Sequence, residues 1–267
     1  MKVTNIKLGC DPELFLEKNN KIVSAEGLIG GTKHKPKLIS EEGHAIQEDN
    51  VMIEFNIPAS SDKKSFKDNI NFVISYLETL VSIIGCKLNF SASAILDPRE
   101  LNTVQSKMFG CEPDYNVYLK KENDSPSSST TLRTAGGHIH IGYDNPDQET
   151  SEEIIYAMDA VLGLESITLD SDDRRRQMYG KAGSFRFKDY GIEYRTLSNF
   201  WIKNDELIDW AYEKTLEAIK LVNSGDIKKI INVHAFAIKK CIDSNDKNES
   251  ILLLNQIKKL IQTVKTK

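Results

Sequence analysis

The first 58 residues alternate apolar and polar positions with the two-residue period of β-strands. Four strands are predicted here, over residues 6–8, 13–17, 22–23 and 51–58. The Asn19-Asn20 pair between the second and third of them indicates a tight hairpin turn. In the fourth strand, Glu54 and Asn56 share one face, and the other face carries four apolar side chains. The pattern therefore predicts a sheet with one buried face and one polar face.

Longer segments repeat apolar residues at the spacing of an α-helix. Five helices are predicted, over residues 65–84, 151–169, 205–222, 230–238 and 249–264. Ser61-Asp62 has the composition of an N-cap for the first of them, and Gly85 ends it. Further strands are predicted over residues 88–96, 132–143 and 186–197. Together these elements predict an α+β fold, with one antiparallel sheet covered on one face by the first three helices.

Composition limits the class of protein. The chain has 267 residues, of which 40% are hydrophobic and 28% charged, as expected for a globular protein. A net charge of -4 argues against a nucleic-acid partner. The four cysteines form no CxxC pair, so a zinc ribbon is not expected. With no signal-like N-terminus and no apolar run of about 20 residues, we predict a cytoplasmic protein without a membrane partner.

Three carboxylates lie on predicted strands. Asp11 and Glu13 point to one side, because Pro12 between them points away. Two carboxylates aimed together repel each other, and a divalent cation is the usual way to neutralise them. The alternative for this pair is a solvated acidic edge strand. Glu54, opposite the apolar face of its strand, is the third candidate metal ligand.

His138 and His140 also share one face of a strand, and they follow Gly136-Gly137. Glycines that interrupt a strand allow a ligand to approach the backbone closely. Imidazole is a less usual ligand for Mg²⁺ than for Mn²⁺ or Zn²⁺, so one histidine could instead contact a phosphate oxygen. The alternative is a pair of core or surface histidines.

Basic residues cluster between residues 174 and 186. Arginine forks suit phosphate oxygens, which makes Arg176 and Arg186 candidate ATP-phosphate ligands. For Arg174 and Arg175, which follow two aspartates, a solvated charge run is the simpler expectation. Lys33 follows a glycine pair that loosely resembles a phosphate loop but lacks the Walker A spacing.

Glu193 and Arg195 complete the set of candidates, because they project together from one side of a predicted strand. A sheet face that gathers carboxylate, guanidinium and imidazole groups is poorly explained by packing. Metal ions and phosphate together explain it better.

Seven segments, in this order, resemble the phage-type carboxylate–amine ligases (COOH.NH2 ligase type 2) of the glutamine synthetase and glutamate–cysteine ligase superfamily. They are Gly9-Cys-Asp-Pro-Glu13, Ile29-Gly-Gly-Thr-Lys33, Asp49-Asn-Val-Met-Ile-Glu-Phe-Asn56, Gly110-Cys-Glu-Pro-Asp-Tyr115, Gly136-Gly-His-Ile-His-Ile-Gly142, Tyr179-Gly-Lys-Ala-Gly-Ser-Phe-Arg186 and Tyr190-Gly-Ile-Glu-Tyr-Arg-Thr-Leu-Ser-Asn199. The resemblance covers about residues 5 to 225. It implies a catalytic domain over residues 1–225, to which we assign residues 226–267 as a C-terminal helical extension.

The resemblance also implies an ATP-dependent ligase with a curved antiparallel sheet whose concave face holds two or three Mg²⁺ or Mn²⁺ ions. Asp11, Glu13, Glu54 and Glu193 would be metal ligands, although the superfamily often has Glu where Asp11 stands. His140 would contact metal or a nucleotide phosphate. Arg186 and Arg195 would neutralise the γ-phosphate and an acyl-phosphate intermediate. The catalytic set is then Glu54, Arg186 and Arg195, and the nucleotide-binding set is Lys33, His138, His140, Arg176 and Arg186.

The residues agree with this chemistry, because phosphoryl transfer requires metals and arginines to spread charge. The substrates would be a small-molecule or peptide carboxylate and an amine, in the host cytoplasm if a phage encodes the protein. Three alternatives remain open. They are a metal-dependent hydrolase, an ATP:guanidino phosphotransferase on the same scaffold, and an inactive virion-associated binding module.

Overall fold

The computed structural model describes residues 2–107, 114–124 and 131–265. Residues 110–113 of the fourth motif and most of the predicted serine-rich loop lie outside these ranges. The helices of the described chain are α1 (Lys63–Ile83), α2 (Val104–Lys107), α3 (Gln148–Met158), α4 (Leu164–Leu169), α5 (Asp205–Ser224), α6 (Asp226–Ser244) and α7 (Lys247–Lys265). Among the described residues, no helix combines the length and apolar character needed to cross a bilayer.

Six strands form a first antiparallel sheet, sheet I, in which the histidine strand is paired on both sides. Its order is β1 (Lys7–Cys10), β12 (Ile139–Gly142), β14 (Gly191–Tyr194), β13 (Ser184–Lys188), β9 (Tyr115–Asn116) and β10 (Lys121–Glu122). β13 and β14 are a hairpin, so Arg186 and Glu193 are paired directly.

The second antiparallel sheet, sheet II, holds the remaining N-terminal strands. Its order is β3 (Lys21–Val23), β2 (Glu13–Lys18), β6 (Met52–Asn56), β5 (Ala45–Asp49) and β4 (Lys37–Leu38), and β7 (Lys87–Asn89) also pairs with β2. A separate ribbon pairs β8 (Ser93–Ile95) with β11 (Leu132–Thr134). Every strand pairing is antiparallel, which confirms the predicted α+β class.

The expectation of a single sheet is wrong, and Pro12 gives the physical reason. Proline has no backbone N–H to donate to a ladder, so it favours a break in pairing. On one side of it, the Asp11 backbone N–H donates to His138 in sheet I. On the other side, Glu13 pairs with Glu54 in sheet II. The first strand of the chain therefore leaves one sheet and enters the other at Pro12.

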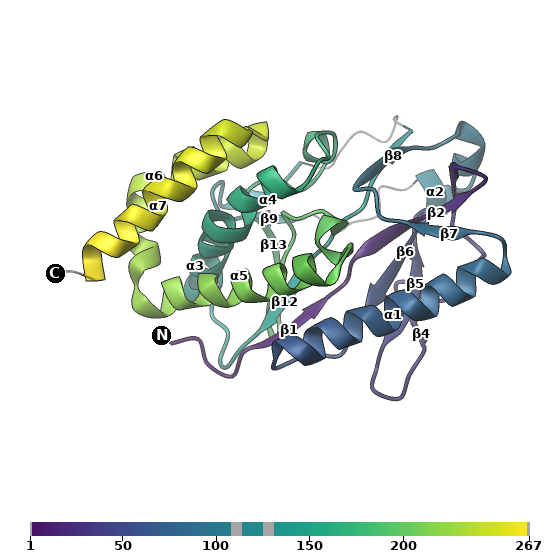
Figure 1. Ribbon diagram of the computed structural model, residues 1–267, viewed down its shortest axis with the longest axis horizontal. Helices are drawn as coiled ribbons and strands as arrows, with labels where there is room; N and C mark the ends of the chain where they lie inside the picture. Colours follow the sequence, from purple (N-terminus) through teal and green to yellow (C-terminus); the bar gives the residue numbers. More distant parts are fainter. Residues whose placement is uncertain (1, 108–113, 125–130, 266–267) are drawn as a thin grey trace.

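The helices cover one side of both sheets, as predicted. Figure 1 shows α1 crossing sheet II and α3 to α5 lying over sheet I. The apolar stripe of α1 is buried in the same core as Ile53 and Phe55, and Glu54 and Asn56 lie half-buried on the opposite face of β6. The Asp62 side chain accepts a hydrogen bond from the Ser65 N–H at 2.9 Å, which confirms the predicted N-cap.

The predicted hairpin turn is confirmed by Asn19 and Asn20, whose φ angles of 51° and 59° are those of a tight turn. Helix 151–169 is found as α3 and α4, joined by a π-helical segment at Asp159–Gly163. The helix predicted over 230–238 is longer, as α6, whose buried residues Ile227, Cys241 and Ile242 lie outside the predicted range. The boundary we assigned at residue 225 falls on the turn at Gly225 between α5 and α6.

Candidate metal and phosphoryl-transfer site

A row of paired residues crosses sheet I at Glu193. The strand register places Gly9 opposite His140, His140 opposite Glu193, and Glu193 opposite Arg186. Residues paired directly in antiparallel strands project to the same face. This face lies opposite Ile139, Ile141 and Ile192, which are buried against the helices. The row therefore presents an imidazole, a carboxylate and a guanidinium away from the core.

Cluster A consists of Asp11, His140 and Glu193, which offer ligand atoms that all lie within 4.8 Å of one another. Asp11 bridges both histidines, with Oδ1 3.0 Å from His138 Nδ1 and Oδ2 3.2 Å from His140 Nε2. His138 Nδ1 lies 3.6 Å from Glu193 Oε1. The spacing at two-residue intervals thus brings both histidines to one carboxylate pair.

Cationic side chains surround Glu193. Arg195 Nη1 donates to Glu193 Oε1, Arg186 Nη1 lies 3.6 Å from the same oxygen, and Lys188 Nζ lies 2.7 Å from Oε2. Asp114 supports the two arginines, with its Oδ1 2.5 Å from Arg195 Nε and 3.9 Å from Arg186 Nε. Glu193 itself is fully buried.

These contacts set the charge of cluster A. Burial would raise the pKa of Glu193, but Arg195 and the two histidines lower it to about 2. Burial also opposes the ionisation of Asp11, yet His140 and His138 hold its pKa well below the usual range. Burial and the nearby Arg195 lower the pKa of His138. For His140, the attraction of Asp11 exceeds the effect of burial and raises the pKa.

Cluster B consists of Glu13, Asp49 and Glu54, from the neighbouring strands of sheet II, again with ligand atoms within 4.8 Å. Glu13 and Glu54 are paired across β2 and β6. Gln47 Nε2 donates to Glu54 Oε1 at 3.0 Å, and the Gly136 N–H donates to Glu13 Oε2 at 2.5 Å. Within the described residues, no lysine or arginine lies within 4.0 Å of these three carboxylates.

Cluster B is consequently reluctant to ionise. Burial and the nearby Asp49 raise the pKa of Glu13 to about 7. Burial and the charges of Asp11, Asp49 and Glu13 raise the pKa of Glu54 well above its ordinary value. Crowded carboxylates of this kind favour a divalent cation.

Both clusters fit a metal on the observed geometry. In each cluster, one ligand atom from each of three side chains lies within 4.8 Å of the others, which is close enough for a single cation to contact all three. Oxygen-only cluster B suits Mg²⁺ or Mn²⁺, and the imidazole of cluster A favours Mn²⁺ among the two. Pro12 therefore divides the predicted Asp11–Glu13 pair between two clusters.

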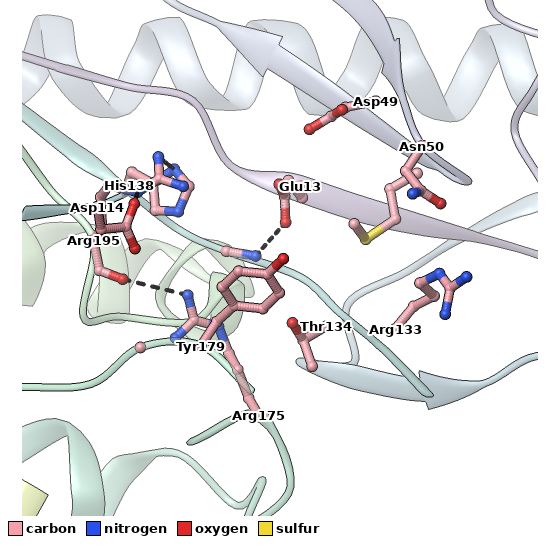
Figure 2. A pocket seen from close by; sticks show the side chains of 13 residues that line it. Glu13, Asp49, Asn50, Asp114, Arg133, Thr134, His138, Arg175, Tyr179 and Arg195 are labelled. Carbon is pink, nitrogen blue, oxygen red and sulfur yellow. Dashed lines mark hydrogen bonds and ion pairs between the residues drawn. The ribbon is translucent and has the colours of Figure 1, made fainter. Parts of the chain in front are cut away.

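A cavity of about 50 Å³, the arginine pocket, is lined by Glu13 and Asp49 of cluster B and by His138 and Arg195, which contact cluster A. Figure 2 shows Glu13 near its centre, with His138 and Arg195 on one side and Asn50 and Arg133 on the other. Arg175 forms part of its wall and donates to the carbonyl oxygens of Ala135 and Thr196 at 3.2 and 3.0 Å. The expectation that Arg175 is a solvated charge is wrong, since it is 4% exposed and burial lowers its pKa to about 10.

A larger hollow of about 780 Å³, the tyrosine pocket, opens beside cluster A. His140 forms one edge, and the Tyr190 hydroxyl bonds to His140 Nδ1 at 2.7 Å. The rest of its wall combines apolar and polar groups, including Ile57, Asn56 and Tyr143. His140 is thus a member of cluster A and also forms part of the wall of the tyrosine pocket.

Two sequence candidates lie elsewhere. The Arg176 guanidinium donates to Gly180 O, Ser166 Oγ and Asn245 Oδ1, at 2.9, 3.1 and 3.3 Å, and so joins the basic loop to the helices. Lys33 is exposed and does not line either pocket. The structure does not bring either residue to the clusters.

Backbone N–H groups of the glycine loop before Lys33 already bind a side-chain carboxylate of the protein itself, that of Glu48. Glu48 Oε1 accepts from the N–H groups of Ile29 and Gly30 at 2.9 and 2.7 Å, and Oε2 accepts from Gly27 at 2.8 Å. Backbone N–H groups gathered in this way form an anion-binding concavity. Since Glu48 fills it, the loop shapes β5 instead of presenting free amides to phosphate.

Sequence reasoning missed Asp49, Asp114 and Lys188 as members of the site. Asp49 and Asp114 stand inside two of the motifs that carry the resemblance, which was the available signal. Lys188 lies two residues after Arg186 on the same strand, so the two-residue rule applied to Glu193 and Arg195 also predicts it.

The C-terminal half of the chain matches one known protein family. Residues 127–266 match a family described as "Phage phiEco32-like COOH.NH2 ligase-type 2". This range is more than half of the chain and contains both histidines, Glu193, Arg186 and Arg195, but not the N-terminal carboxylates. No curated protein matches the chain.

Solved structures that the chain is similar to share little sequence with it. One, titled "GmaS/ADP complex-Conformation 1", has a TM-score of 0.45 and 11% identity, with 98% of this chain and 70% of that chain covered. A "novel glutamine synthase homolog" has a TM-score of 0.40 and 11% identity, over 97% and 67% of the two chains. A Plasmodium falciparum glutamine synthetase has a TM-score of 0.37 and 11% identity, over 80% and 52%.

Proposed function

Because this chain belongs to the phage phiEco32-like COOH.NH2 ligase-type 2 family, we propose that it is an ATP-dependent ligase that joins a carboxylate to an amine. The observation that carries the proposal is that arginines accompany both carboxylate clusters. Arg186 and Arg195 lie beside Glu193 of cluster A, and Arg175 and Arg195 line the pocket that Glu13 and Asp49 of cluster B also line. A metal-dependent hydrolase would use the carboxylates and histidines but has little need for these arginines.

The chemistry begins with an unreactive carboxylate. Transfer of the γ-phosphoryl group of ATP to a carboxylate oxygen breaks the bond between the γ-phosphorus and its bridging oxygen, and it yields an acyl phosphate and ADP. Attack of the neutral amine on the acyl carbon then forms the amide bond and expels inorganic phosphate, while the amine loses one proton. Both steps develop negative charge on phosphoryl oxygens, which guanidinium groups stabilise.

The residues that would hold divalent cations are those of the two clusters. Asp11, His140 and Glu193 would hold one, and Glu13, Asp49 and Glu54 another. Bound Mg²⁺ or Mn²⁺ would neutralise charge on the ATP phosphates and polarise the transferred group. Arg195 stays fixed by Asp114 and keeps Glu193 ionised, so that the carboxylate is ready to bind a cation.

The two pockets suit the two kinds of substrate. The tyrosine pocket has the volume and the mixture of apolar and polar lining residues that a nucleoside requires. His140 of cluster A lines this pocket. The arginine pocket presents Arg175 and Arg195 to a carboxylate that lies beside cluster B. We assign the nucleotide to the first pocket and the carboxylate to the second, with no part for Arg176 or Lys33.

The test is a screen for ADP release over pools of carboxylic acids and amines, with Mg²⁺ or Mn²⁺, followed by mass analysis of the products. The proposal predicts ADP release that requires both a carboxylate and an amine, and one amide for each ADP. Glu193→Gln is the negative control for contaminating ATPases. Cleavage of an amide without ATP would indicate the hydrolase, and a phosphorylated guanidino product would indicate the phosphotransferase. ATP binding without any turnover would indicate an inactive module.

A further inference from the structure

Protein cations already contact both oxygens of Glu193. Oε1 accepts a hydrogen bond from Arg195 Nη1, while Oε2 lies 2.7 Å from the Lys188 ammonium. A metal ion coordinated through Oε2 would lie close to the Lys188 ammonium, and the two positive charges would repel each other. The side chain that gives way therefore decides what happens on metal binding.

Lys188 is the more mobile of the two partners. The Arg195 side chain is 4% exposed and its Nε is held by Asp114, whereas the Lys188 side chain is 32% exposed. Lysine carries its charge on a flexible four-carbon stem, and the rigid arginine fork does not. Lys188 can turn toward solvent without breaking any other contact shown by the described residues.

Two glycines separate Lys188 from a second lysine, Lys7, along one row of sheet I. The register pairs Lys188 with Gly191, Gly191 with Gly142, and Gly142 with Lys7, two residues along each strand from the row that contains Glu193. These four residues face the same side as Glu193, and Lys7 and Gly142 line the tyrosine pocket. Two glycines between two lysines form a cationic trough that suits a polyphosphate chain.

We propose that Lys188 is a nucleotide-binding residue that occupies Glu193 Oε2 in the metal-free protein and moves to an ATP phosphate when a divalent cation takes its place. The inference rests on the proposed function, because it requires a metal at Glu193 and ATP in the tyrosine pocket. It adds an ordered exchange of partners, in which the ammonium holds the metal position before the metal arrives.

The exchange predicts opposite effects from one substitution. In Lys188→Met the cation no longer competes with an ammonium for Glu193, so Mn²⁺ should bind about tenfold more tightly in the absence of nucleotide. The same variant lacks one charge-assisted contact to phosphate, so the ATP analogue AMP-PNP should bind about tenfold more weakly at saturating Mn²⁺. A lysine with a purely structural role would weaken both ligands together.

The experiment measures free Mn²⁺ by electron paramagnetic resonance and AMP-PNP by calorimetry, for the full chain. Lys121→Met, on β10 of the same sheet and exposed, is the matched control and should leave both affinities unchanged. Lys7→Met should weaken AMP-PNP alone, because Lys7 borders the trough at the far end from Glu193. Lys188→Arg should retain most of the AMP-PNP affinity, and melting curves exclude a folding defect.

The outcomes separate this inference from the proposed function. Unchanged or weaker Mn²⁺ binding in a folded Lys188→Met would overturn the exchange, as would an unchanged AMP-PNP affinity. Both results leave the ligase proposal standing if Glu193→Gln still abolishes one Mn²⁺ site in the wild-type background. If wild-type protein binds Mn²⁺ without any dependence on Glu193, the metal assignment itself is wrong.

Discussion

Glu193 illustrates how a carboxylate remains ionised inside a protein. It is fully buried, which alone would favour the neutral form, but Arg195 and the histidines outweigh that effect. Reasoning from sequence emphasised repulsion among the acidic residues. That description holds for cluster B, where three carboxylates meet without a basic partner within 4.0 Å among the described residues. In cluster A, by contrast, Arg195 and the two histidines compensate the negative charges of the carboxylates.

Glu193→Ala is therefore expected to destabilise the metal-free protein. Its removal leaves the buried Arg195 without one of its two carboxylate partners, and breaking a buried pair in this way costs about 3 kcal/mol. Chemical denaturation in EDTA measures the free energy of unfolding. Arg99→Ala, which breaks an exposed pair with Asp97, is the control and should show no measurable change. An unchanged or higher stability of Glu193→Ala would contradict the contacts described around this residue.

Arg186→Ala is expected to lower ATP turnover by on the order of 10²-fold or more, because it removes a cation placed to stabilise phosphoryl charge. Steady-state ADP release is the measurement, with Arg99→Ala on the exposed surface as the matched variant. Comparable turnover of the two variants would remove Arg186 from the reaction.

At the scale of elements, Pro12 and the two glycines of the trough determine where the strands run. Pro12 transfers the chain between sheets, so that Asp11 and Glu13 serve different clusters. Gly191 lets β14 pass directly beside β12. A Cβ added there would lie 2.1 Å from the Ile141 carbonyl oxygen, and its φ of +148° is unfavourable for other residues.

Gly191→Ala is expected to cost several kcal/mol in unfolding free energy, because the clash is with backbone that cannot move without breaking the β12–β14 ladder. The neighbouring Gly142→Ala is the control. Its added Cβ would meet nothing closer than 3.6 Å, so the fold should be retained. Thermal melting of both variants is sufficient, and equal melting temperatures would contradict the register given for these strands.

The π-helical segment between α3 and α4 contributes a buried acid on the far side of sheet I. Asp159 is 0% exposed, and the Tyr194 hydroxyl donates to its Oδ1 at 2.6 Å. Burial raises the pKa of Asp159 to about 7 despite this hydrogen bond. In the unfolded chain an aspartate ionises near pH 4. Between these values the folded state therefore binds the additional proton.

The sign of the resulting stability change follows from that proton. Stability from Asp159 is fully present below about pH 4 and declines as the pH rises toward 7, by roughly 4 kcal/mol. Asp159→Asn cannot ionise, so its unfolding free energy should gain on that of the wild type as the pH rises from 5 to 8. Denaturant titrations at several pH values measure the difference. A constant difference would show that Asp159 does not titrate in this range.

At the scale of the whole molecule, the site is assembled from distant sequence. Residues from Asp11 to Arg195 meet where the two sheets adjoin, and the long helices on the other side bury the apolar faces that hold them there. Ser250 Oγ of α7 donates to the Leu164 carbonyl at 2.6 Å, so the C-terminal helices pack on the same helical layer. Figure 1 shows α6 and α7 at the end of the molecule away from sheet II.

How far the sequence predicts this arrangement depends on the range of the interaction. The two-residue period correctly relates Glu54 to Ile53 and Phe55, because side-chain direction in a strand is local. The division of strands into two sheets depends on which ladder each strand joins, which local pattern does not specify. The burial of Arg175 likewise depends on a carbonyl oxygen contributed from elsewhere in the fold, that of Ala135.

The central claim is that the protein activates a carboxylate as an acyl phosphate and transfers it to an amine. The most direct test uses the substrate pair found by the ADP screen, with ¹⁸O in both oxygens of the carboxylate. Because the carboxylate oxygen attacks phosphorus and leaves with it, mass spectrometry should find one ¹⁸O in inorganic phosphate for each amide formed. Amide formation with unlabelled phosphate would contradict the account.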